Sequence, residues 1–115
     1  MKDYKSLIIW RKSIDLVVKI YQLTNNFPST EKFGLVSQMR RAAISIPSNI
    51  AEGSRRKNGL DNNNFLRIAF GSATELETQL EISKKLAFCK SDKQQKEINL
   101  LLVEILKMLN AMTKY

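Results

Sequence analysis

Apolar residues recur at spacings of three and four along most of the chain, which is the period of an amphipathic helix. The first such stretch runs from Leu7 to about Asn25. One apolar row, expected to face the core, consists of Trp10, Ile14, Val17 and Tyr21. A neighbouring row consists of Ile9, Leu16, Ile20 and Leu23. Together they form an apolar arc wider than one bundle helix needs.

A second helix is predicted from about Thr30 to Arg56, with Ser29 or Thr30 as its N-cap. Its core stripe consists of Val36, Met39, Ala43, Ile46 and Ile50. Pro47 lies inside this pattern, where it removes a backbone donor and crowds the preceding turn. Because the apolar phase resumes at Ile50, we expect a helix kinked near Pro47 instead of two helices.

Two further helices complete the pattern. The third opens at Asp61 or a nearby Asn and keeps its phase to about Phe88, and the fourth follows the capping-box residues 91–94. The apolar stripe of the fourth helix consists of Ile98, Leu101, Leu102, Ile105, Leu109 and Met112. Four helices with short connections predict an all-α fold, an up-down-up-down antiparallel four-helix bundle forming one domain over residues 1–115.

The fourth helix carries a second apolar edge, formed by Leu100, Val103 and Leu106. In a single bundle this edge would face water, so we expect it to form an interface between copies of the chain. The alternative is that an asymmetric bundle buries both rows internally.

Polar residues also follow a helical period on the second and third helices. On the second helix they are Gln38, Arg41, Ser45, Asn49 and Glu52, and on the third Ser72, Glu75 and Gln79. Polar groups that interrupt apolar rows are costly unless they bond one another. We therefore expect a structural network across the two helices, in which Arg41 meets Glu75.

The residue types restrict the chemistry. The 115 residues include no histidine and one cysteine, Cys89, which excludes histidine-based catalysis, a di-iron bundle site and an internal disulfide. We expect a protein without cofactor or metal, with Cys89 as a small buried residue. The alternative enzyme is a metal-dependent hydrolase using Glu52, Glu75 and Glu77.

The location of the protein follows from what its segments lack. No segment approaches the roughly 18–20 apolar residues that span a bilayer, and the amino terminus has no export-signal pattern. We expect a cytoplasmic protein with no membrane association.

Positive charge is concentrated in the first half of the chain. The formal net charge is +8, and residues 30–58 carry six basic and two acidic groups. Such a balance is typical of proteins that bind polyanions. The candidate nucleic-acid contacts are Arg40, Arg55, Arg56 and Lys57, with Arg41 kept for the structural network. The chain shows no sequence-reading motif, so any binding should follow backbone charge.

Two stretches carry a resemblance to a known family. They are GLVSQMRRAAISIPSNIAEG at 34–53 and IAFGSATELETQL at 68–80. The chain resembles the ribosomal-RNA intervening-sequence proteins, although Phe70 stands where that family commonly has a small or basic residue. The resemblance implies a bundle that assembles into a pentamer. That family is also similar to the accessory protein of diversity-generating retroelements, a basic pentamer that binds nucleic acid and works with a reverse transcriptase.

We therefore expect a non-enzymatic, homo-oligomeric, pentameric basic protein that binds RNA or DNA backbone. It would act as an accessory or adaptor, with a reverse transcriptase or another protein as partner. The alternative is a protein-protein assembly module whose basic surface has no nucleic-acid role.

Overall fold

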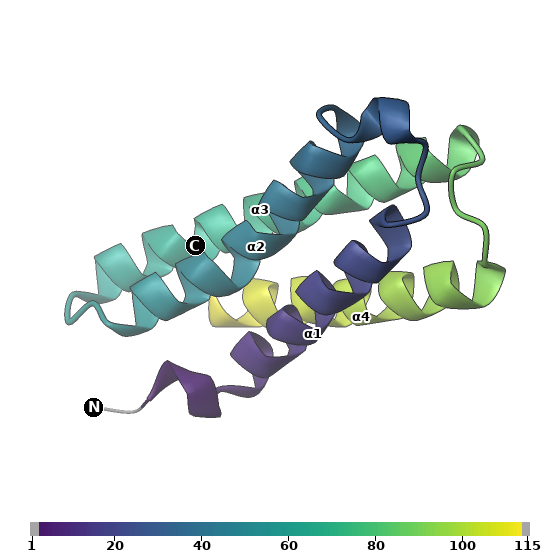
Figure 1. Ribbon diagram of the computed structural model, residues 1–115. Helices are drawn as coiled ribbons and strands as arrows, with labels where there is room; N and C mark the ends of the chain where they lie inside the picture. Colours follow the sequence, from purple (N-terminus) through teal and green to yellow (C-terminus); the bar gives the residue numbers. More distant parts are fainter. Residues whose placement is uncertain (1–2, 114–115) are drawn as a thin grey trace.

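The computed structural model describes residues 3–113, which form helices and turns and no strand (Figure 1). The four long helices are α1 (Ile8–Thr24), α2 (Leu35–Ser54), α3 (Gly59–Lys85) and α4 (Asp92–Met112). Two 3₁₀ turns, η1 (Tyr4–Ser6) and η2 (Ser29–Glu31), precede α1 and α2. Each long helix packs against the next, and α4 packs against α1, which closes the bundle. The all-α four-helix bundle is confirmed. The up-down order of the helices stays a prediction.

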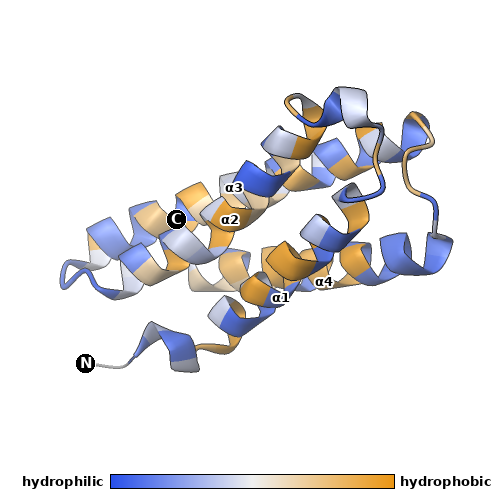
Figure 2. Cartoon of the chain, in the orientation of Figure 1, coloured by the Kyte–Doolittle hydropathy of each residue, from blue (hydrophilic) through white to orange (hydrophobic). Residues whose placement is uncertain are grey.

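The core lies between the four helices, where their apolar faces meet (Figure 2). On α1 the buried row is Ile9, Leu16, Ile20 and Leu23. The Trp10 row is only partly buried: Trp10 and Val17 pack against the core, whereas Tyr21 is 40% exposed. The Trp10 row lies along the seam between α1 and α2, where the Trp10 ring meets Tyr4 edge-on.

The second helix begins five residues later than predicted. Ser29 and Thr30 belong to the 3₁₀ turn η2, and neither is an N-cap of α2. Gly34 stands before α2 with φ −108° and ψ −110°, a backbone conformation outside the helical region. The carboxylate of Glu31 then accepts a hydrogen bond from the Leu35 N–H at 3.2 Å, supplying the missing cap. The helix continues through the buried Pro47 to Ser54, and the kink there stays a prediction.

Side-chain hydrogen bonds cap the N-terminal ends of α3 and α4. Asn58 caps α3 by accepting a hydrogen bond from the Leu60 N–H at 2.8 Å, and Ser91 Oγ accepts one from the Gln94 N–H at 3.2 Å. The prediction of a nearby Asn and of the Ser91 cap is confirmed. The third helix ends at Lys85, not at Phe88.

Ala87 terminates α3 with a positive φ of 59°. The Phe88 N–H donates to the Ser83 carbonyl at 2.9 Å and the Ala87 N–H donates to the Lys84 carbonyl at 3.0 Å. These two bonds define a Schellman motif, whose left-handed position is usually glycine. Ala87 therefore lies outside the helix and is exposed.

The backbone of α2 lies close to α3 at Gly53. A Cβ atom at this position would lie 3.1 Å from Phe65 Cβ and 3.2 Å from the Asn62 carbonyl oxygen. The Asn62 amide donates back to the Gly53 carbonyl at 2.7 Å. A residue without a side chain is thus required where the α2–α3 turn folds back on itself.

We expect Gly53→Ala to lower the free energy of unfolding by about 1–3 kcal/mol, because the added methyl group must displace α3 backbone or Phe65. Gly71→Ala is the matched control: Gly71 is exposed in α3 and a Cβ there meets nothing within 4 Å. The control should gain up to about 1 kcal/mol from helix propensity. Urea unfolding at one fixed protein concentration measures both, and equal effects at the two glycines would contradict the close approach.

Ala87→Gly should raise the free energy of unfolding by about 1 kcal/mol, since glycine adopts the left-handed conformation without the Cβ penalty. The same substitution at the exposed, helical Ala111 should lower it. Opposite signs in thermal unfolding are the expected result. A loss at both positions would refute the strained Ala87 backbone.

Candidate nucleic-acid interface

The turn between α2 and α3 carries three consecutive basic residues, Arg55, Arg56 and Lys57, all exposed. The Arg55 guanidinium lies 5.2 Å from the centre of the Tyr4 ring, and that of Arg56 lies 4.9 Å from the Phe65 ring. Both distances fall in the range of cation–π contacts, which hold a guanidinium in place without neutralising it. Arg56 also pairs with Glu52 at 2.9 Å.

The 3₁₀ turn η1 brings further positive charge to the same end of the bundle (Figure 1). Lys5 belongs to η1, and the Arg11 Nε donates to the Lys5 carbonyl at 2.9 Å. We call Lys5, Arg11, Arg55, Arg56 and Lys57 the basic end. The contribution of η1 was not predicted, since three residues carry no periodic signal and only the Tyr4–Arg55 contact places them there.

Few of the basic groups at this end are paired with carboxylates. Asp3, Glu52 and Asp61 are the neighbouring acidic groups. Among residues 3–113 the ion pairs are Lys12–Glu104, Lys19–Glu97 and Arg56–Glu52. Of the basic end, Arg56 alone is therefore joined to a carboxylate within the described chain.

Arg40, the fourth predicted contact, lies apart from the other three. It precedes Arg55 by fifteen positions, which is about 22 Å along a helix. Its guanidinium stacks 4.3 Å from the Tyr21 ring centre, and its Nε donates to Thr24 Oγ1 at 3.0 Å. Half-buried Arg40 thus joins α2 to α1, so the structure does not gather the four predicted contacts into one surface.

The polar strip on α2 and α3 forms a smaller network than predicted. The hydroxyls of Ser45 and Ser72 lie 2.7 Å apart, and the Asn49 amide donates to the Ser45 carbonyl and hydroxyl at 2.8 and 2.9 Å. These three residues link the two helices midway along their length. Such a link suits a partly buried seam, where unpaired polar groups are costly.

The charged members of the strip stand outside that network. Arg41, Glu75 and Gln38 are exposed and border an open depression between α2 and α3. No ion pair among the described residues joins Arg41 to Glu75, so that expectation was wrong. Glu52 pairs with Arg56 instead, and Gln79 is buried with its Oε1 atom lacking a partner. Exposed ion pairs gain little over hydration, which explains why proximity alone did not join Arg41 to Glu75.

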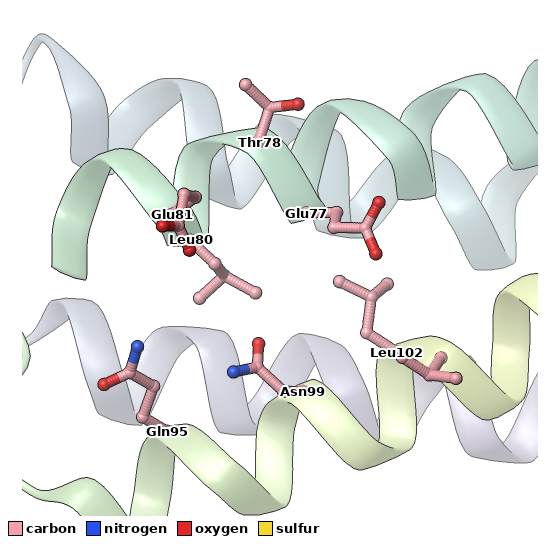
Figure 3. Close-up of a pocket in the computed structure, with 8 residues that line it drawn as sticks. Glu77, Thr78, Leu80, Glu81, Gln95, Asn99 and Leu102 are labelled. Atoms are coloured by element: carbon pink, nitrogen blue, oxygen red, sulfur yellow. The ribbon is translucent and has the colours of Figure 1, made fainter. Parts of the chain in front are cut away.

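The three carboxylates of the alternative hydrolase do not converge. Glu75 borders the α2–α3 depression, Glu52 lies at the end of α2, and Glu77 faces α4. Figure 3 shows Glu77 and Glu81 on α3 opposite Gln95 and Asn99 on α4. Within residues 3–113 no three His, Cys, Asp or Glu side chains are placed to hold a metal ion.

The apolar edge of α4 is only partly covered. Leu100 is 73% exposed and Val103 is 41% exposed, whereas Leu106 is half-buried against the core. Two of the three residues predicted to form an oligomer interface are therefore open to a partner. The third contributes to the bundle itself.

Two single residues complete the account. Cys89 is half-buried and burial raises the pKa of its thiol, which keeps it protonated and a poor nucleophile at neutral pH. Phe70, the departure from the family pattern, packs half-buried against the core.

None of the helices in the described chain is both long and apolar enough to span a bilayer.

Comparison with known proteins places the chain in a family. No curated protein matches it. A crystal structure of a protein of unknown function from the S23 ribosomal protein family of Bacteroides thetaiotaomicron is similar, with a TM-score of 0.82 and 29% identity. The similarity covers 94% of this chain and 100% of that one. The 23S rRNA-intervening sequence protein family matches residues 5–111, and the chain, a four-helix bundle like its neighbour, belongs to that family.

Proposed function

We propose that the chain is a non-enzymatic, homo-oligomeric protein that binds nucleic-acid backbone through its basic end and acts as an accessory or adaptor. The observation that carries the proposal is the collection of five basic residues at one end, of which Arg56 alone pairs with a described carboxylate. Basic side chains on such a surface neutralise backbone phosphates and release the counterions condensed on the nucleic acid, which gives binding without sequence preference. The cation–π contacts hold both arginines, and Arg55 keeps its charge free of any ion pair within the described residues.

The homo-oligomeric part of the proposal rests on the α4 edge. Leu100 and Val103 present branched apolar side chains to solvent on one helix face, and a second copy is the partner that we propose to cover them. The pentameric stoichiometry comes from the family resemblance. A ring of copies would repeat the basic end around one axis, which favours binding to a long polyanion.

The absence of an enzymatic role in this proposal follows from the positions of the carboxylates. Glu52, Glu75 and Glu77 lie on three different parts of the surface, so they supply no paired acid and base. Neither the family description nor the neighbour's title names an enzyme. We propose a cytoplasmic location, with RNA or DNA and a polymerase or other protein as partners.

A protein-protein assembly module is the second candidate, favoured by the same exposed Leu100 and Val103. The two candidates differ in their response to salt. A backbone binder loses affinity steeply between low and moderate salt, whereas an assembly module shows no nucleic-acid binding to lose.

Replacing Arg55, Arg56 and Lys57 together by Glu should weaken RNA binding by about tenfold or more and reduce the salt slope by up to about three. Fluorescence anisotropy over a salt series measures both quantities, with circular dichroism to check the fold. A charge-matched control replaces Arg41, Lys93 and Lys96, which are exposed and lie away from this end. Equal losses in the two variants would show a general charge effect and no basic-end site.

Replacing Leu100 and Val103 by Ser should dissociate the oligomer into smaller species without unfolding the bundle, because both side chains are solvent-facing in one chain. Light scattering coupled to size exclusion reports the mass. Leu60→Ser, at another exposed apolar position, is the control that should leave the mass unchanged. An unaltered mass in the Leu100 and Val103 variant would place the interface elsewhere.

A further inference from the structure

The end of the bundle opposite the basic end carries an aromatic ring that is almost fully open to solvent. Phe33 is 89% exposed, more than Leu100 or Leu60. A phenylalanine held in water forgoes the stabilisation that burial would give, so a ligand that covered the ring would gain apolar contact. No contact with the core covers the ring, because Phe33 is not among the residues packed against it.

The turn that carries Phe33 is held by several hydrogen bonds. The Lys32 N–H donates to the Ser29 carbonyl at 3.2 Å, and the Gly34 N–H donates to the Glu31 carbonyl at 3.1 Å. The Glu31 carboxylate in turn accepts from the Leu35 N–H at the start of α2. Phe33 therefore projects from a bonded turn between two helical segments, which lowers the entropy cost of a contact to its ring.

One lysine lies beside this ring, and three more lie at the same end of the bundle. Lys32 Nζ lies 5.5 Å from the Phe33 ring centre. The α3–α4 connection lies at the same end, since the Phe27 and Phe88 rings from the two connections are 5.5 Å apart. That connection and the end of α3 supply three exposed lysines, Lys84, Lys85 and Lys90. None of these four lysines is in an ion pair of the described chain.

We propose that Phe33 is a stacking platform for an unpaired base of single-stranded RNA or DNA, with Lys32 and the other lysines at this end binding the flanking phosphates. The inference rests on the proposed function and adds a second site with a different ligand preference. An exposed aromatic ring beside cations is the arrangement by which proteins hold single strands, because every base has a face that stacks. In a duplex those faces are already covered by neighbouring base pairs, so the site selects unpaired nucleotides.

Other occupants suit this surface less well. A membrane-binding segment presents a whole apolar helix face to the bilayer, whereas this end offers Phe33 with Leu86 among lysines. A second copy would have to place its own apolar surface against an aromatic ring that lies next to a lysine. The charge and the single ring together favour a phosphate-bearing, base-bearing ligand.

The test compares a single-stranded oligouridine of about ten nucleotides with a blunt-ended duplex of similar length, which has no unpaired bases. Both are measured by fluorescence anisotropy with the full chain at one salt concentration. Phe33→Ala should weaken binding of the single strand by about 5- to 100-fold and leave duplex binding unchanged. Phe33→Trp should restore it, and Leu60→Ala, the loss of another exposed apolar side chain outside this turn, should change neither affinity.

The outcomes separate this site from the basic end. Unchanged single-strand binding in Phe33→Ala, with loss in the Arg55, Arg56 and Lys57 variant, overturns the platform and retains the proposed function. A wild-type chain that binds neither probe overturns both. A changed mass in light scattering for Phe33→Ala, or loss of binding to phosphatidylserine-containing vesicles with no change for the oligouridine, assigns the ring to assembly or to a membrane and overturns the platform.

Discussion

The close packing of α2 against α3 determines where the turn between them, with its three basic residues, lies on the surface. Two features permit it: Gly53 at the turn, where no Cβ fits, and the Ser45–Ser72 bond midway along the seam. Small core residues, Ala42, Ala69 and Ala73, continue the same close approach. Because the two helices are in contact over most of their length, the turn between them is short, and its three basic residues are displayed together at one end.

The sequence predicted the fold well where periodic patterns were long. Helices α1 and α4 match their expected bounds within one or two residues, because an apolar row and a side-chain cap act locally. The predicted helix ends were wrong where the backbone conformation of one residue, and not the side-chain pattern, determines where a helix begins or ends. Gly34 delays α2 despite plausible caps at Ser29 and Thr30, and Ala87 adopts a left-handed conformation that a Cβ usually disfavours. Neither is visible in spacing alone.

The candidate site was less predictable, because it depends on contacts between segments far apart in the sequence. Arg55, Arg56 and Lys57 were recognisable as a cluster, but the addition of Lys5 and Arg11 required the packing of Tyr4 on Arg55. Likewise, the sequence did not distinguish Arg40 from Arg55 and Arg56, because all three are positively charged residues on or next to the same helix. Its stacking on Tyr21 depends on where α1 places that ring, which no single helix determines.

The separation of Phe33 from the basic end has a consequence for the geometry of a ring. In a cyclic assembly whose axis followed the long direction of the bundle, every copy would turn the same end upward. One rim would then carry repeated arginine-rich turns and the other repeated aromatic turns. Such a particle has two chemically different faces, so a folded nucleic acid could span it from a paired stem on one rim to an open loop on the other. The helix length, and not any single contact, would then set which stem-loop sizes are accepted.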